Sequence, residues 1–295
     1  MIMQETSSTT DSDSEIQVRR VAIQGYSGAF HEIAAHLFFK EEGIAIAPAN
    51  TFNEVVEMVE KGEADTALMA IENTLAGSIM PNFNLLNDSK LKIVGEVYLR
   101  IKQNLMVLPG QKVEDLKEVH SHYMAIAQCR GFFMNYPHIH LVETTDTALS
   151  AKIVRDENLQ DVGAIASTLA ADLYGLEIIG SSIETNKLNY TRFLVLRREE
   201  TVEEIESANK VSLCFSIEHE VGSLHKVLAL MSAYDLNLTK IQSTPIIGKQ
   251  WEYMFFVDFV IKGKVSWKQA LDAIRPLTTN LKVMGAYEGG DHFEY

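Results

Sequence analysis

The stretch NYTRFLVL, residues 189–196, places three hydrogen-bonding side chains directly before an apolar run. They are Asn189, Thr191 and Arg192, and the run FLVL that follows them is typical of a buried strand. A guanidinium at the mouth of such a strand is unfavourable unless an anionic group pairs with it. The pattern therefore predicts that Arg192 meets an anion, although binding to the carbonyl groups of a helix C-terminus is an alternative.

Polar residues also follow other predicted strands in the first two thirds of the chain. Short apolar runs such as VAIQG, TALMAI and VGAIAS alternate with helical patterns, which indicates crossover units and a largely parallel sheet. The carboxyl ends of the strands in such a sheet face the ligand crevice, where helix N-termini offer free N–H groups to an anion. The polar residues at these strand ends are Ser27, His31, Glu72, Asn73, Thr74, Ser121, His122, Thr144, Thr145, Asp146, Thr147, Ser167 and Thr168.

Helix capping is an alternative explanation for several of these residues. Ser27, Asp146 and Ser167 belong to the residue types that are favoured at helix N-caps regardless of function. A capping pair formed by Ser121 and His122 is about as plausible as a catalytic pair. The strand ends therefore locate a candidate site without assigning a role to each member.

Composition and charge exclude several classes of partner. The chain has 295 residues and a formal net charge of −14, from 26 basic and 40 acidic residues, which argues against nucleic acid as a partner. Cys129 and Cys214 lie far apart in the sequence and predict neither a disulfide framework nor a metal site. The first residues, MIMQETSSTTDSDSE, are acidic and polar, unlike a signal peptide, and no membrane-length apolar run follows. A cytoplasmic protein without a membrane partner is expected.

The character of the chain changes near residue 199. Residues 199–209, EETVEEIESAN, are acidic with few apolar side chains and are expected to form a linker. After them, residues 210–295 follow the order β-α-β-β-α-β, which is the ferredoxin-like arrangement. We therefore expect a disordered tail at residues 1–18, an α/β domain at residues 19–198, the linker, and a ferredoxin-like domain at residues 210–295.

Several segments together resemble a known family. NYTRFLVL resembles the Asn-x-Thr-Arg-Phe signature of prephenate dehydratases, and GYSGAFHEIAA, AIENTLAGSI and HSHYMAIAQC are similar to three further motifs of that family. DTALSAKIV and GAIASTLAADLYGL complete the set, in the family's order, across residues 20–198. The tail, with GSLHKVLALMSAYDLNLTKIQSTP, resembles the regulatory ACT domain that follows the catalytic domain in this family. The departures from the motifs are Tyr26, Ala70 and Tyr123 in place of proline and Thr74 in place of serine.

The resemblance implies a fold and a reaction. The fold is a two-lobed α/β catalytic domain of periplasmic-binding-protein-like type with mostly parallel sheets, followed by a ferredoxin-like ACT domain. The reaction is the decarboxylating dehydration of prephenate to phenylpyruvate, which gains aromaticity and requires no metal or cofactor. Prephenate carries two carboxylates, so it supplies the anion that Arg192 needs.

The resemblance also implies roles for individual residues. Thr191 is expected to donate a hydrogen bond to the departing hydroxyl, alone or as a relay from Glu72 or His122, because a threonine hydroxyl is too weak an acid to give up its proton outright. The expected catalytic residues are Thr191, Arg192, Glu72, His122 and Asn189. The expected substrate-binding residues are Ser27, Gly28, Asn73, Thr74, Ser121, Thr147, Ser167 and Phe193.

Phenylalanine is the allosteric ligand that the resemblance implies, bound where ACT domains of a homodimer or homotetramer meet. The expected contacts are Gly222, Ser223, Leu224, Gln242, Ser243, Thr244 and Pro245. Gln242 and Thr244 stand where the family has glutamate and arginine, so a salt bridge is replaced by a neutral pair. Weaker binding of phenylalanine is therefore expected.

Two alternative functions remain open from the sequence. Arogenate differs from prephenate by an amino group in place of the keto oxygen, and the motifs do not separate the two substrates. A non-catalytic intracellular sensor with the same two-lobed architecture is the alternative outside the enzymes.

Overall fold

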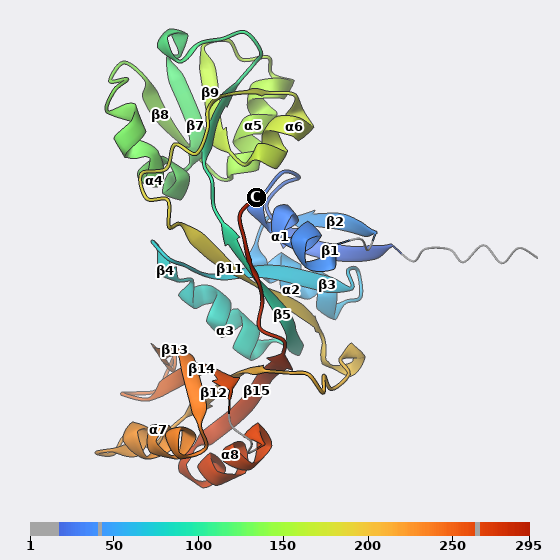
Figure 1. Ribbon diagram of the computed structural model, residues 1–295, viewed down its shortest axis with the longest axis vertical. Helices are drawn as coiled ribbons and strands as arrows, with labels where there is room; N and C mark the ends of the chain where they lie inside the picture. Colours follow the sequence, from blue (N-terminus) through green and yellow to red (C-terminus); the bar gives the residue numbers. More distant parts are fainter. Residues whose placement is uncertain (1–17, 41–42, 263–265) are drawn as a thin grey trace, which may run out of the picture.

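The computed structural model describes residues 18–40, 43–262 and 266–295. Its three sheets are stacked along the long axis of the molecule, with two α/β lobes above a smaller C-terminal unit (Figure 1). The predicted disordered tail, residues 1–18, lies outside the described residues except for Val18, which is exposed. No described helix is long and apolar enough to span a membrane.

The first lobe is built on a sheet with the order β16-β5-β11-β3-β1-β2, and β4 pairs with β3. Its strands are β1 (Arg19–Gln24), β2 (Ile44–Ala49), β3 (Thr66–Asn73), β4 (Gly77–Ser78), β5 (Leu91–Arg100), β11 (Tyr190–Arg198) and β16 (His292–Phe293). Its helices are α1 (Phe30–Phe39), α2 (Phe52–Glu60) and α3 (Met80–Asp88). The first six residues of β3 are all buried, because both faces of the sheet are covered there.

The second lobe has a sheet of five strands in the order β10-β6-β9-β7-β8. The strands are β6 (Asn104–Val107), β7 (Glu118–His122), β8 (His140–Thr144), β9 (Val162–Ala166) and β10 (Glu177–Gly180). The helices are α4 (Tyr123–Phe133), α5 (Thr147–Asp156) and α6 (Thr168–Tyr174), and a 3-10 turn, η1, spans Val113–Asp115. The chain enters this lobe after β5 and returns to the first lobe through β11.

Both lobes have mixed sheets, so the prediction of mostly parallel sheets is wrong. β1 pairs in parallel with β2 and β3, but β11 lies antiparallel between β3 and β5. In the second lobe β7 is parallel to β8 and β9, whereas β6 is antiparallel to β9. The reason is that the chain passes from the first lobe to the second and then returns. The strand on which it re-enters a sheet is antiparallel to its neighbours.

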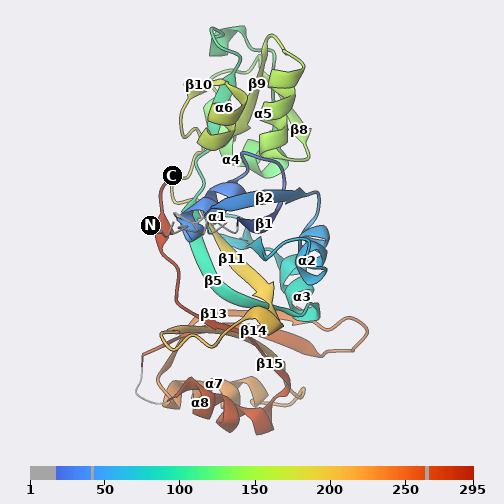
Figure 2. The same ribbon diagram turned by 90° about the vertical axis from the view of Figure 1, so that its right-hand side faces the viewer.

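The C-terminal unit, residues 210–287, has the predicted β-α-β-β-α-β order. It contains β12 (Lys210–Ser216), α7 (Ser223–Ala233), β13 (Leu236–Pro245), β14 (Tyr253–Ile261), α8 (Trp267–Ile274), a 3-10 turn η3 (Arg275–Leu277) and β15 (Thr279–Tyr287). The strands form an antiparallel sheet in the order β13-β14-β12-β15. Both helices cover one face of this sheet, and the other face is turned toward the first lobe (Figure 2). Cys214, Phe256 and Tyr287 on that face join a core cluster of the first lobe.

The chain does not end within the C-terminal unit. After β15 it runs back to the first lobe, where β16 pairs in parallel with β5. The segment between β11 and β12 contains only a 3-10 turn, η2 (Glu199–Thr201), among its secondary structure. Residues 288–295 therefore pack on the first lobe, although the sequence predicted that they belong to the C-terminal domain.

Candidate functional site

A cleft with a volume of about 740 Å³ lies between the two lobes. Its walls come from both lobes, with Asn73, Thr191 and Phe193 on one side and His122 and Thr147 on the other. Ligand pockets of small molecules have volumes of roughly 300–1,000 Å³. The cleft is therefore large enough for a small organic substrate.

Five of the described helices begin at this cleft. The first residue of each lines it, and these residues are Phe30 of α1, Phe52 of α2, Met80 of α3, Tyr123 of α4 and Thr147 of α5. Helix N-termini carry partial positive charge and backbone N–H groups without intrahelical partners. Among the described residues that line the cleft there is no lysine or arginine. An anion bound there would be held by backbone dipoles and neutral donors.

The Thr191 hydroxyl is held by a network of side-chain amides. Asn73 Nδ2 lies 3.0 Å from Thr191 Oγ1 and 2.8 Å from Asn189 Oδ1. Asn189 is fully buried, and its own Nδ2 donates to Gln128 Oε1 at 2.9 Å. Thr191 thus accepts a hydrogen bond from Asn73, and within the described part of the chain its own proton has no acceptor. That proton is available to a molecule in the cleft.

Asn73 also fixes the turn in which it lies. Its Oδ1 accepts hydrogen bonds from the backbone N–H groups of Leu75 and Ala76, at 2.9 and 3.0 Å. The same side chain therefore shapes the turn between β3 and β4 and fixes the position of Thr191 on β11. Sequence reasoning assigned Asn73 to the site but missed Gln128, which lies in the family-like segment HSHYMAIAQC and could have been selected there.

His122 and Asp146 lie on the second-lobe side of the cleft, and both are helix N-caps. His122 Nδ1 accepts from the N–H of Met124 at 3.4 Å, and Asp146 Oδ1 accepts from the N–H of Leu149 at 2.9 Å. Burial lowers the pKa of His122 and raises the pKa of Asp146. A lowered pKa keeps the His122 imidazole neutral at neutral pH, when it can accept the bond from Met124.

Five of the predicted site residues line the cleft, and the others do not. The five are Asn73, His122, Thr147, Thr191 and Phe193. Asn189 lies just behind them, in contact with Asn73. The residues placed elsewhere are Ser27, Gly28, Glu72, Thr74, Ser121, Ser167 and Arg192.

Arg192 lies on the opposite face of β11 from the cleft, so the prediction that it meets a substrate anion is not supported. Its Nε donates to Glu96 Oε2 at 2.7 Å and its Nη1 to Asp258 Oδ2 at 2.5 Å. Only 3% of the residue is exposed. Burial opposes its charge, but the carboxylates of Asp258 and Glu96 outweigh this and raise the pKa of Arg192 well above its ordinary value. The physical reason is strand alternation, since Thr191 and Phe193 face the cleft and the residue between them faces away.

Glu72 is displaced from the cleft for the same reason. It precedes Asn73 on β3, and its carboxylate accepts hydrogen bonds from Lys240 and from Arg192 Nη1, the latter at 3.3 Å. A relay of protons from Glu72 to Thr191 would have to cross the sheet. The geometry therefore leaves His122 as the one predicted relay group that lines the cleft.

The remaining displaced residues have structural roles. Ser167 caps α6, as predicted, and its Oγ donates to the carbonyl of Gly28 at 2.6 Å. Gly28 has a φ of +90°, and a Cβ there would lie 2.8 Å from Ala170 Cα, so this position requires glycine where the lobes touch. Ser121 is buried with its Oγ on the carbonyl of Ile165. The Thr74 hydroxyl donates to the backbone carbonyl of Leu188, and the backbone carbonyl of Ser27 accepts from the Tyr174 hydroxyl.

His31 also lines the cleft, on α1. Its ring lies edge-on to Phe193, with 4.9 Å between centroids, and 5.6 Å from the ring of Phe52. Its Nε2 is buried without a hydrogen-bond partner among the described residues. Burial lowers the pKa of His31 from 6.5 to about 4.

This buried histidine predicts a loss of stability in acid. As the pH falls below about 6.5 the unfolded chain binds a proton at His31, whereas the folded protein binds it only near pH 4, so the free energy of unfolding decreases across that interval. A shift of this size corresponds to about 3 kcal/mol at most. We expect Tm to fall more between pH 7 and pH 4.5 in the wild type than in His31→Phe. Equal falls in the two proteins would contradict this account.

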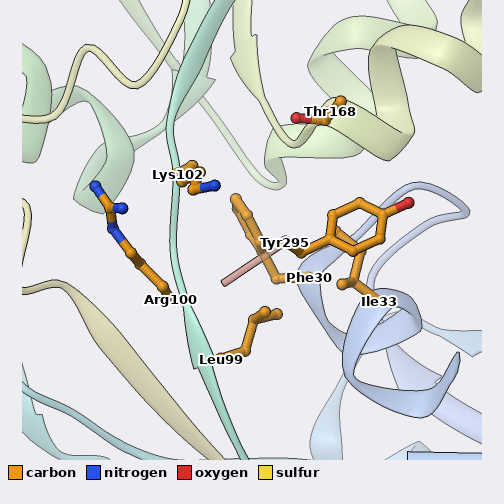
Figure 3. A pocket seen from close by; sticks show the side chains of 7 residues that line it. All are labelled: Phe30, Ile33, Leu99, Arg100, Lys102, Thr168 and Tyr295. Atoms are coloured by element: carbon orange, nitrogen blue, oxygen red, sulfur yellow. The ribbon is translucent and has the colours of Figure 1, made fainter. Parts of the chain in front are cut away.

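A second, smaller cavity lies at the junction of the lobes (Figure 3). Arg100, Lys102, Thr168 and Tyr295 are among the residues that line it, and its volume is about 10 Å³. This volume is room for about one water molecule. The two cations there therefore do not form a substrate site, and the larger cleft remains the candidate.

The predicted regulatory residues are divided between two places. Gly222, Ser223 and Leu224 line a cavity of about 180 Å³ at the beginning of α7. Gln242, Ser243, Thr244 and Pro245 lie on β13, outside that lining. Gln242 Oε1 accepts a hydrogen bond at 3.1 Å from Ser78, a residue that lines the cleft.

Comparisons with known proteins show the family to which the chain belongs. Residues 21–201 match the family described as prephenate dehydratase. Arogenate dehydratase 2 of Petunia hybrida is 38% identical over 285 residues, which cover 91% of this chain and 71% of that protein. A solved prephenate dehydratase of Arthrobacter aurescens in complex with L-Phe is 26% identical with a TM-score of 0.81, and covers 91% of this chain and 89% of its own. The structure of GqqA, described as a novel type of quorum quenching acylase, is 30% identical with a TM-score of 0.83, over 92% of this chain and 98% of its own. The chain belongs to the prephenate dehydratase family of enzymes.

Proposed function

We propose that the cleft converts prephenate to phenylpyruvate, with Thr191 as the donor to the departing hydroxyl. The observation that carries the proposal is the Thr191 hydroxyl, which accepts from Asn73, has no acceptor for its own proton among the described residues, and lines a cleft at which five described helices begin. Membership of the prephenate dehydratase family supports the reaction. The described residues that line the cleft include no lysine or arginine, and this supports the helix N-termini as the groups that bind the carboxylates.

The reaction needs these groups and one proton from solvent. The bond between the ring and its carboxylate breaks, carbon dioxide leaves, and the electron pair moves through the ring as the bond to the hydroxyl breaks. The hydroxyl departs as water with a proton that comes from solvent, while Thr191 keeps its own proton and donates only a hydrogen bond. A donor placed at the developing negative charge lowers the barrier, and Thr191 is such a donor. Helix N-termini bind the second carboxylate and hold the substrate in register.

Arogenate is the second candidate substrate, because the Petunia relative is named an arogenate dehydratase. Its ammonium group would require an acceptor in the cleft. Asp146 is the one carboxylate among the described lining residues, and the backbone N–H groups of Leu149 and Ala148 already engage it. This favours the keto substrate.

Turnover of the purified chain with each substrate decides between the candidates. We expect phenylpyruvate from prephenate at a higher kcat/KM than phenylalanine from arogenate. A higher value with arogenate would reverse the assignment of substrate. Binding of both compounds without turnover of either would instead indicate a ligand sensor.

The C-terminal unit is proposed to be an ACT domain that binds phenylalanine and joins the chain into dimers or tetramers. The support is its β-α-β-β-α-β order and the cavity at the left-handed Gly222, where φ is +83°. The Arthrobacter aurescens structure, similar over most of the chain, contains L-Phe. Binding should be weak because neutral Gln242 and Thr244 replace the charged pair of the family.

Phenylalanine is therefore expected to inhibit and to stabilise this protein. A ligand that binds the folded state raises Tm, and at a concentration one hundred times Kd it contributes about 2.7 kcal/mol. We expect both effects at millimolar concentration, measured as prephenate turnover and as thermal melting. If neither changes up to several millimolar, the substitutions at Gln242 and Thr244 have abolished the site.

A further inference from the structure

Six charged side chains meet where the first lobe contacts the C-terminal unit, and we call them the interdomain ion cluster. Glu72, Glu96 and Arg192 come from the first lobe, and Lys210, Lys240 and Asp258 come from the C-terminal unit. The three cations balance the three anions. The first lobe contributes a net charge of −1 and the C-terminal unit +1, so the two surfaces attract each other.

Most of the cluster is excluded from water. Arg192, Glu96, Lys210 and Asp258 are each at most 6% exposed. Lys210 Nζ binds both oxygens of Glu96, at 2.7 and 2.9 Å, and Arg192 Nη2 donates to the hydroxyl of Tyr287 at 3.1 Å. Charges removed from water interact more strongly than exposed ones, so the cluster resists displacement of either surface.

Lys240 extends the cluster to the strands that line the cleft. Its Nζ binds the carboxylate of Glu72 on β3 and the hydroxyl of Ser78 on β4, the latter at 2.9 Å. Ser78 in turn donates to Gln242, which is two residues after Lys240 on β13. One strand of the C-terminal unit thus holds both strands of the β3–β4 hairpin.

The proposed catalytic hydrogen bond lies on the other face of the sheet, between β3 and β11. Glu72 pairs with Arg192 across the β3–β11 ladder, and the next residues, Asn73 and Thr191, also pair with each other. Neighbouring residues of a strand point to opposite faces. The interdomain ion cluster therefore lies directly behind the Asn73–Thr191 bond, and neither Lys240 nor Asp258 lines the cleft.

We infer that Lys240 and the interdomain ion cluster position Asn73 and Thr191, so that the C-terminal unit sets the rate of the reaction without contacting the substrate. This inference rests on the proposed role of Thr191. A bond of 3.0 Å weakens when its partners shift by a fraction of an ångström, and such shifts lower kcat more than KM. The predicted phenylalanine segment, Gln242–Pro245, continues the strand that carries Lys240, so a ligand there could act through the same hairpin.

Lys240→Gln tests the inference, with Lys249→Gln as the matched control. Lys249 is also on the C-terminal unit, but it is exposed, and its ion pair with Glu252 lies within that unit. We expect Lys240→Gln to lower kcat about five- to tenfold with KM within twofold of wild type, while Lys249→Gln changes neither. In a Thr191→Ala background Lys240→Gln should have little further effect, because residues that act as one unit are not additive.

Hydrogen exchange tests the same inference without turnover. Amides of residues 66–78 and 190–193 should exchange faster in Lys240→Gln than in Lys249→Gln, with both proteins folded by thermal melting. If wild type turns over neither substrate, the proposed function fails, and the exchange result still decides whether Lys240 holds the hairpin. Unchanged exchange overturns the inference. A fully additive loss of kcat in the Thr191→Ala background overturns it as well.

Discussion

Thr191→Ala is expected to lower kcat about a hundredfold or more while KM changes little. Loss of one donor to a transition-state charge commonly costs this much, about 2.7–4 kcal/mol. Folding should be almost unaffected, because Asn73 Nδ2 keeps the acceptors Asn189 Oδ1 and Tyr190 O, at 2.8 and 3.1 Å. Steady-state kinetics with the better substrate, together with thermal melting, measures both expectations.

Thr191→Ser is the control for this prediction. Serine keeps the hydroxyl that accepts from Asn73, so it should retain most of the activity that alanine loses. A Thr191→Ala enzyme with kcat near the wild-type value would remove Thr191 from the mechanism. His122, the other candidate donor on the cleft wall, would then be the residue to replace.

The local elements of the fold could be predicted from the sequence. Strands such as VAIQG and TALMAI are specified by apolar runs, and the starts of α5 and α6 by the caps Asp146 and Ser167, each of which accepts from a backbone N–H three residues further on. The β-α-β-β-α-β order of the C-terminal unit was predictable for the same reason. The mixed sheets were not, because the antiparallel position of β11 depends on where the chain returns from the second lobe.

The candidate site was predicted in part. Thr191 and Phe193 line the cleft, and strand alternation could have shown that Arg192, between them, faces the other way. Its partners could not have been found in this way, since Glu96 and Asp258 are 96 and 66 residues distant and approach only when the C-terminal unit packs on the first lobe. The helix N-termini around the cleft, which we propose bind the substrate in place of Arg192, likewise come together only in the folded arrangement.

Arg192→Leu separates the sequence hypothesis from the structural one. If Arg192 bound the substrate, its loss would raise KM and leave Tm unchanged. The structure instead places it among Glu72, Glu96 and Asp258, with only Lys210 and Lys240 left to balance them after the substitution. Removing one member of a buried ion pair destabilises a protein by about 3–5 kcal/mol.

We therefore expect Arg192→Leu to lower Tm by about 10 °C, since each kcal/mol shifts Tm by about 2–4 °C in a domain of this size. Arg192→Lys should lower it less, because an ammonium keeps the charge but cannot direct separate donors to Glu96, Asp258 and Tyr287 as Nε, Nη1 and Nη2 do. Thermal melting and kinetics of both variants give the comparison. A wild-type Tm with a raised KM would mean that Arg192 binds the substrate and that the interdomain ion cluster contributes little to stability. A lowered Tm with KM near the wild-type value would show that Arg192 pairs with carboxylates of the protein itself.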